Sequence, residues 1–211
     1  RQTEKVRERL AARRSAIIEA ARALASEHGM DAVQIAPVAE RACIAAGTVY
    51  RYFPSKTALV EALVEAVADS EIAAMRDAAE AAPGPLSGLA AAIVTLSARA
   101  RRQKRLIWAL TTEPVAPEVD AVRANFRCAL AKELESRLKS QDAADIPAAL
   151  AAPALLGALL EGLIGPLAAA DTNGVATGAS AAPDDRERVQ MVALLALRGV
   201  GIMDARARRR G

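Results

Sequence analysis

The sequence predicts an all-α fold, and three features of its composition and patterning support this. Alanine, the strongest helix former, dominates a chain of 211 residues that is 53% hydrophobic. Aromatic side chains make up only 2%, so the core must be built from Ala, Leu, Val and Ile. No segment alternates apolar and polar residues over a strand length with β-branched enrichment. We therefore expect about nine helices and no sheet.

Charge and chain-breaking residues suggest how these helices are divided. Residues 1–60 hold ten Lys/Arg against six Asp/Glu, a net charge of +4, whereas the remainder carries a net charge of −1. A basic N-terminal excess is typical of proteins that bind nucleic acid. Ala82-Pro83-Gly84-Pro85 breaks the helical pattern further along. We expect a first domain at 1–56 with an arm at 1–14, a second helical domain at 57–205 and a basic tail at 206–211.

The sequence argues against an enzyme, a metal site and a membrane protein. The chain has one histidine, His28, and no ligand cluster, nucleophile elbow or Gly-rich phosphate loop, so we expect no catalytic residue, metal or cofactor. Cys43 and Cys128 are expected to be reduced, buried thiols. The most apolar stretch, 146–170, is interrupted by three prolines and Glu161. We expect a soluble, cytoplasmic protein.

The N-terminal elements have the layout of a helix-turn-helix. From Ser15 onward, apolar residues recur at helical spacing until Gly29, which supplies a C-terminal stop. A short helix is expected from about Ile35 to Ala42, with Pro37 tolerated in its first turn. A tight connection follows, and a third helix begins near Ala45 or Ala46.

The charged arm, residues 1–14, allows two interpretations. Four arginines are interleaved with Glu4 and Glu8, which fits a frayed, solvated, helical lead-in to the first helix. The same residues also fit a basic arm that lies near DNA phosphates. The composition does not decide between them.

Residues from about 10 to 60 resemble the DNA-binding domain of the TetR family of bacterial transcriptional repressors. Three upstream segments carry part of the resemblance: Ile18-Glu19-Ala20-Ala21, Gly29-Met30-Asp31-Ala32-Val33 and Val38-Ala39-Glu40-Arg41-Ala42. The most specific segment follows in register, Gly47-Thr48-Val49-Tyr50-Arg51-Tyr52-Phe53-Pro54-Ser55-Lys56-Thr57-Ala58-Leu59.

The residues of the third helix suit contact with DNA. Arg51 has the forked guanidinium that pairs with guanine, and Thr48 has a hydroxyl for phosphate and a methyl for thymine. Val49 and Phe53 face the small core, where Tyr50 is expected to pack more often than to touch bases. The resemblance implies that Tyr52 and Lys56 hold phosphates and that residues 46–51 read bases. The candidate DNA-binding residues are Gln34, Ala46, Gly47, Thr48, Tyr50, Arg51, Tyr52 and Lys56.

Three positions depart from the family pattern. Val33-Gln34 stands where a Ser or Thr usually caps the second helix, Cys43 replaces the usual turn glycine, and Ala45 replaces the usual cap of the third helix. Each lost cap is expected to cost about 1 kcal/mol of local stability. Specificity is therefore expected to rest on Gln34, Thr48 and Arg51.

The rest of the chain is expected to form helices that bind a small molecule and dimerise. Ser55 caps a helix to about Ala79, and further helices are expected at 86–105 and from Pro117 to Lys139. The last two, about 147–170 and 184–206, are apolar on more than one face and predict a homodimer interface. Glycines 157, 199 and 201 are expected to permit close helix approach there.

We expect a ligand-responsive transcriptional repressor that binds a palindromic double-stranded DNA operator as a dimer. A small, hydrophobic inducer would release it, and ordinary core packing competes with a pocket role for the aromatic candidates. The alternative is a helical small-molecule-binding protein with a vestigial helix-turn-helix. The candidate ligand-binding residues are Trp108, Thr111, Thr112, Phe126 and Glu161.

Overall fold

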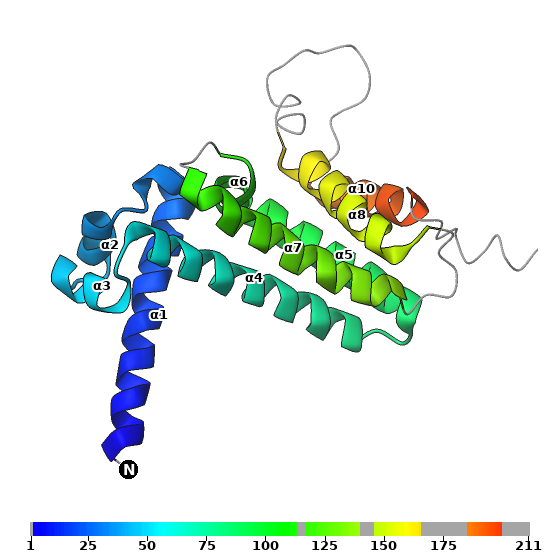
Figure 1. Ribbon diagram of the computed structural model, residues 1–211. Coiled ribbons are helices and arrows are strands. Elements are labelled where there is room, and N and C mark those ends of the chain that lie inside the picture. Colours follow the sequence, from blue (N-terminus) through cyan, green and yellow to red (C-terminus); the bar gives the residue numbers. More distant parts are fainter. Residues whose placement is uncertain (1, 114–116, 140–145, 166–184, 200–211) are drawn as a thin grey trace, which may run out of the picture. The chain divides into compact units, whose positions relative to one another are not determined.

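The computed structural model describes residues 2–113, 117–139, 146–165 and 185–199, and within these ranges the protein is wholly helical (Figure 1). Nine α-helices and one short 3-10 helix occur there, without a strand among the described residues, which confirms the predicted all-α fold. The elements are α1 (Gln2–His28), η1 (Met30–Ala32), α2 (Ile35–Arg41), α3 (Ala46–Tyr52), α4 (Lys56–Glu80), α5 (Pro85–Arg102), α6 (Lys104–Thr111), α7 (Pro117–Lys139), α8 (Ala148–Leu163) and α10 (Asp185–Gly199).

Local signals in the sequence account for several helix ends. The Ser55 hydroxyl accepts the Ala58 amide at 3.0 Å, so the predicted cap of α4 is confirmed. Pro117 begins α7, as its fixed φ and missing N–H favour. Gly29 ends α1 with φ of +87°. Helix α1 begins at Gln2, so it continues through the charged segment that precedes Ser15.

Contacts divide the chain into two compact units. Unit 1 comprises Arg1–Ala68 and Arg105–Phe126, and unit 2 comprises Asp69–Lys104 and Arg127–Gly211. Helices α4 and α7 each run through both units. This division follows packing, whereas the boundary predicted near residue 56 follows function and stays a prediction.

Unit 1 holds the helix-turn-helix on a small aliphatic core. The second half of α1 buries one apolar face against η1 and α2, which in turn contacts α3. Every buried position here repeats at a spacing of three or four residues, as an amphipathic helix requires. The core includes Ile17, Ile18, Ala21, Leu24, Val38, Val49, Phe53, Leu59 and Leu63.

Unit 2 is a bundle held by apolar packing and by two buried carboxylates. Glu71 of α4 is almost fully buried and accepts from the Arg99 guanidinium of α5, with its Oε2 2.7 Å from Nε. Hydrogen bonding to Glu71 raises the pKa of Arg99, so this pair stays charged. Glu133 of α7 likewise accepts from Arg76 Nε at 2.9 Å. Removing one member of the Glu71 pair would leave a buried charge without its partner.

Helix α10 packs on α8 and α5, and glycine contributes to this packing at one position. A Cβ on Gly162 would lie 3.3 Å from the Val192 Cγ2, so the two helices approach closely there. A Cβ on Gly157 or Gly199 would meet nothing of this chain within 4 Å, so their expected role in a dimer interface stays a prediction. Gly201 lies outside the described residues.

Both cysteines were predicted to be buried, and both are exposed. Cys43 occupies the turn between α2 and α3, where its side chain projects from the chain reversal. Cys128 lies on α7 away from the buried row that contains Phe126 and Leu130. Among the residues that the structure describes, no helix is both long enough and apolar enough to cross a bilayer.

Candidate DNA-binding site

The turn between α2 and α3 is a Schellman motif built without glycine. The Ile44 amide donates to the Ala39 carbonyl and the Cys43 amide donates to the Glu40 carbonyl, both at 3.0 Å. Cys43 occupies the left-handed position with φ of 54°, where glycine is favoured because a Cβ is strained. The chain therefore keeps the turn geometry of a helix-turn-helix despite the missing glycine.

Helix α3 presents one face to its own core and another to solvent. Val49 and Phe53, four residues apart, are buried and anchor the helix on unit 1. Tyr50 lies roughly a quarter-turn from Val49 and is 54% exposed, so the expected core packing of this ring is wrong. A seven-residue helix with one buried row leaves no second buried position for it.

The exposed face of α3 combines a cation, a phenol and an open stretch of backbone. Arg51 and Gly47 are exposed, while Ala46, Thr48 and Tyr52 are half-buried. A Cβ on Gly47 would meet nothing of this chain within 4 Å. The surface at Gly47 is therefore open to close approach by a partner, with Tyr50 and Arg51 beside it.

The N-terminus of α4 adds a site for an anion next to this face. Lys56 is the first residue of the helix and is half-buried. Helix N-termini carry amides without intrahelical acceptors and the positive end of the helix dipole. A phosphate at this end would meet both the Lys56 ammonium and these amides.

The caps of α2 and α3 lack side-chain hydrogen bonds, as predicted from the departures at Gln34 and Ala45. The Gln34 Nε2 donates instead to the Asp31 carbonyl at 3.0 Å, although its side chain is exposed. Gln34 therefore lies at the N-terminus of α2, but its side-chain amide already donates one hydrogen bond within the chain.

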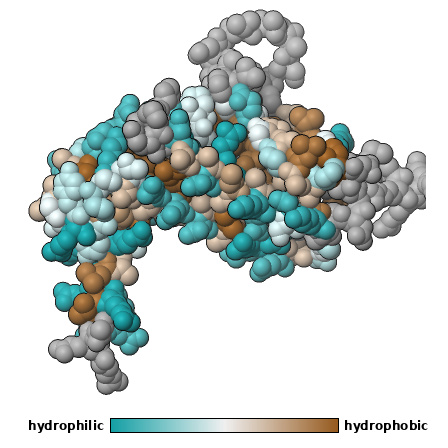
Figure 2. Space-filling model, in the orientation of Figure 1, coloured by the Kyte–Doolittle hydropathy of each residue, from teal (hydrophilic) through white to brown (hydrophobic). Residues whose placement is uncertain are grey.

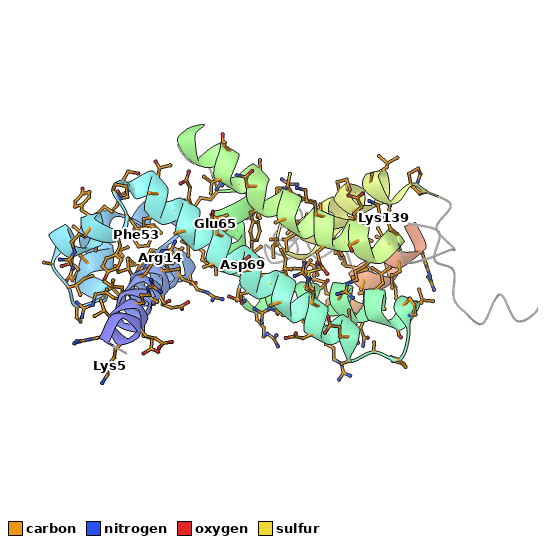
Figure 3. The ribbon with its side chains drawn as sticks, turned by 60° about the horizontal axis from the view of Figure 1, so that its bottom comes forward. Lys5, Arg14, Phe53, Glu65, Asp69 and Lys139 are labelled. Carbon is orange, nitrogen blue, oxygen red and sulfur yellow. The ribbon has the colours of Figure 1, made fainter. Side chains whose placement is uncertain are left out.

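Two side-chain contacts hold α2 and α3 against α1. Arg41 at the end of α2 donates through Nη1 to the Glu27 Oε2 of α1 at 2.6 Å, and this bond lowers the pKa of Glu27. The Arg14 guanidinium lies over the Phe53 ring, 5.3 Å from its centroid (Figure 3). The ends of α2 and α3 are thus both tied to the long first helix.

The predicted ligand-binding residues are distributed over both units. Trp108, Thr111 and Thr112 lie on or just after α6, and Phe126 lies on α7, all four in unit 1. Phe126 is fully buried and Trp108 half-buried, while the Thr111 hydroxyl donates to the Ile107 carbonyl at 2.6 Å. Glu161 is exposed on α8 in unit 2.

Unit 2 contains a cavity of about 400 Å³ between α5 and α10, and none of the predicted ligand residues lines it. Three of its seven lining side chains are arginines, which suits an anionic group, and the others are mostly apolar. The lining residues are Val94, Ala98, Arg101, Arg102, Arg186, Val189 and Gln190.

Known proteins share both the helix-turn-helix segment, which we call the head, and the fold. Residues 17–63 match the sequence model of the family described as "Bacterial regulatory proteins, tetR family". The helix-turn-helix segment of the chain is therefore of the TetR type. The match runs from the buried half of α1 through the helix-turn-helix into α4, so it includes every candidate DNA-binding residue.

Sequence relatives match a short part of the chain. The HTH-type transcriptional repressor KstR of Rhodococcus jostii is 57% identical over 56 residues, covering 26% of this chain and 25% of that protein. KstR of Mycolicibacterium smegmatis is 56% identical over 48 residues, or 23% and 24% of the two chains. The chain thus matches about a quarter of the length of these curated relatives.

Solved TetR-like structures share the fold over most of the chain. A putative TetR-family transcriptional regulator from Rhodococcus sp. is similar with a TM-score of 0.74 and 16% identity, over 90% of this chain and 99% of that one. FadR of Bacillus subtilis, solved with stearoyl-CoA, is similar with a TM-score of 0.62 and 18% identity, over the same shares. At these identities the likeness concerns the fold alone.

The sequence analysis missed two features of this protein. Arg123 is buried on α7, donates through Nη2 to the Ala109 carbonyl at 2.7 Å, and has its pKa lowered by burial. Its place between Val122 and Phe126, both on the apolar face, was the available signal. The second feature is the cavity of unit 2, which joins arginines of α5 and α10, two helices that are distant in sequence.

Proposed function

We propose that the protein is a ligand-responsive transcriptional repressor that binds a palindromic operator as a homodimer. The observation that carries this proposal is the face of α3 on which Gly47, Tyr50 and Arg51 are exposed, with Lys56 at the start of the next helix. Such a face fits the major groove of DNA. The TetR-family sequence model matches the chain over this same segment, and relatives named as repressors are similar to the chain over 48 to 56 residues. We expect the protein in the cytoplasm, where bacterial DNA lies.

The side chains divide into base readers and phosphate contacts. Arg51 would donate both arms of its guanidinium to guanine O6 and N7, with Thr48 and the exposed Tyr50 beside it. Ala46 and Gly47 would allow the backbone to come close to the base edges. Phosphates would be held by Tyr52 and Lys56 on one side and by Gln34 at the start of α2 on the other.

The dimer would form through α8 and α10 of unit 2. Leu150 on α8 is 64% exposed and Leu195 on α10 is 68% exposed, and Met191 and Leu194 are also exposed on α10. Figure 2 shows apolar side chains gathered over these two helices. Exposed leucines in this number are typical of a surface that another protein covers. A second copy is the partner that would give two heads for the two halves of a palindrome.

An inducer would act through a helix that belongs to both units. Residues 56–68 of α4 lie in unit 1 and residues 69–80 in unit 2, and the helix is uninterrupted. Ligand binding that displaces one half of α4 must therefore move the other half, with its Lys56. The inducer would have to favour the non-binding arrangement by the free energy that it removes from DNA binding. The ligand contacts that we propose remain Trp108, Thr111, Thr112, Phe126 and Glu161.

The test is a fluorescence anisotropy titration against duplexes tiled from the DNA that flanks the protein's own coding region. We expect one palindromic fragment to bind tightly and with steep salt dependence. Arg51→Ala should abolish the preference for that fragment, whereas Lys56→Ala should weaken all fragments alike. Absence of binding to every fragment would contradict the repressor proposal.

One observation favours the alternative, a helical small-molecule-binding protein with a vestigial head. Helices α2 and α3 both begin without a side-chain cap, at Gln34 and Ala45. A head that no longer reads DNA would tolerate such losses. In that case the same titration would show weak binding without sequence preference, and the Arg51→Ala variant would match the unaltered protein.

A further inference from the structure

The N-terminal half of α1 stands apart from the packed part of unit 1. Helix α1 is continuous from Gln2 to His28, yet every residue from Glu4 to Ala16 is exposed. Figure 1 shows this segment extending beyond α2 and α3 of the same unit. We call residues 4–16 the arm. An isolated helix of this length is marginal in water, so its helical form depends on the buried half that continues it.

The arm continues the apolar face of α1 that packs against the rest of unit 1. Val6 and Leu10 extend, at helical spacing, the apolar row that Ile17, Ala21 and Leu24 bury in unit 1. Val6 is 53% exposed and Leu10 is 49% exposed. The face of α1 that is buried after residue 16 is therefore uncovered along the arm. This holds for the part of the chain that the structure describes.

Charges on the arm are segregated around this face. Arg9 and Arg13 fall on one side of Val6 and Leu10, and Arg7 and Arg14 fall on the other. Glu4 and Glu8 fall on the opposite side of the helix. By helical spacing, the arm thus has its cations and two aliphatic side chains on the face that continues toward the rest of unit 1, and its carboxylates on the opposite face.

The arm also supplies most of the basic charge of the N-terminal domain. Residues 4–16 carry five Lys/Arg against two Glu, a net charge of +3. Residues 17–60, which include the whole helix-turn-helix, carry four Lys/Arg against four Asp/Glu and are neutral. A neutral head has little attraction for a polyanion beyond its individual contacts, because the phosphate charge supplies most non-specific affinity.

Arg14 fixes the base of the arm at the end of the recognition helix. Its guanidinium lies over the ring of Phe53, which ends α3, and Figure 3 shows this pair with Lys5 at the far end of the arm. From Arg14, Arg7 lies two helical turns away, or about 10 Å along the axis. The arm cations are therefore within one turn of duplex, about 34 Å, of the bases that α3 would read.

We propose that the arm is a second DNA-binding element, whose cations hold the phosphate backbone beside the half-site read by α3. This inference rests on the proposed function. The aliphatic pair would lie against deoxyribose between these phosphates. A second copy of the arm fits less well, because two apolar residues fall short of the three to four heptads of a coiled coil and the flanking cations would repel.

The test compares two charge variants of the full chain. In the arm variant, Lys5, Arg7, Arg9 and Arg13 are replaced by Gln, and Arg14 is kept because it packs on Phe53. In the control variant, the exposed Arg102, Arg127, Lys132 and Lys139 are replaced by Gln, with the same change in net charge. Binding to the preferred fragment and to a scrambled duplex is measured by anisotropy from 50 to 300 mM KCl.

We expect the slope of log K against log salt to fall by about 0.9 per lost phosphate contact, or about 3 to 4 units, for the arm variant on both duplexes. The ratio of specific to non-specific affinity should stay the same, and the control should retain the original slope. An unchanged slope in the arm variant overturns the proposal, as does an equal fall in the control. Loss of the dimer by sedimentation would assign the arm to a second copy and also overturn it. Failure of the unaltered protein to bind DNA would instead refute the proposed function.

Discussion

Gly29→Ala tests how the turn after α1 is held, and its cost can be worked from the structure. Gly29 has φ of 87° and ψ of −178°, a backbone region open essentially to glycine alone. An added Cβ would lie 2.5 Å from the Glu113 Oε1, 2.8 Å from its Oε2 and 2.9 Å from the Arg105 Nη2. All of these residues belong to unit 1.

Two contributions add up in this variant. Backbone strain at a non-glycine residue in this region costs about 1–3 kcal/mol. The Glu113 carboxylate must also move, and it then loses the Met30 amide that it accepts at 2.8 Å. A part-buried amide without its acceptor costs about 1–2 kcal/mol. We therefore expect Gly29→Ala to lower the free energy of unfolding by about 2–5 kcal/mol.

Urea unfolding followed by circular dichroism measures this cost, with a double-mutant cycle to separate the two contributions. Gly29→Ala made on a Glu113→Ala background should cost only the strain, about 1–3 kcal/mol. Gly47→Ala is the matched control, because a Cβ there meets nothing within 4 Å and the position is helical. A cost below about 1 kcal/mol would refute the strain argument, and equal costs on both backgrounds would refute the role of Glu113.

Three further predictions concern the turn, the reading surface and the dimer. Cys43→Gly should raise the free energy of unfolding in urea by about 0.5–1 kcal/mol, because it relieves the left-handed strain at φ of 54° at some cost in chain entropy. Cys43→Ala should gain nothing, and a less stable glycine variant would contradict the turn assignment. Gly47→Ala should leave stability intact but weaken operator binding at least tenfold in anisotropy, because the added methyl lies on the open face of α3. Unchanged affinity would mean that DNA does not approach this backbone. Leu194→Asp with Leu195→Asp should convert the dimer to a monomer in sedimentation, whereas Leu86→Asp, also at an exposed leucine, should not; a dimer that survives the double change would place the interface elsewhere.

Short-range chemistry was predicted well because its causes lie within a few residues. Ser55 caps α4 through its own hydroxyl, and Pro117 begins α7 through its own ring. The missing caps at Gln34 and Ala45 were likewise visible in the sequence, since a cap depends on one side chain and the amides that follow it. The family resemblance over the helix-turn-helix rests on the same kind of local pattern.

The candidate DNA-binding surface was predicted in composition but only partly in orientation. A helix of seven residues has too little periodicity to define its rotation, so the exposure of Tyr50 depended on how Val49 and Phe53 seat against α1. The apolar periodicity that begins at Ser15 does not define the start of α1 at Gln2, because the exposed arm is stabilised as a helix by the packed half that continues it.

The sequence by itself determined the helical class, the helix-turn-helix and the helix ends marked by capping residues, because propensity, spacing and caps act over a few residues. Only the tertiary structure decided which charges are buried and which apolar faces are left uncovered. Glu71 meets Arg99 across 28 residues, and the exposed leucines of α10 become a surface only once α8 and α5 cover the other faces of that helix. Burial is a property of what packs against a residue, and its packing partners lie far away in the chain.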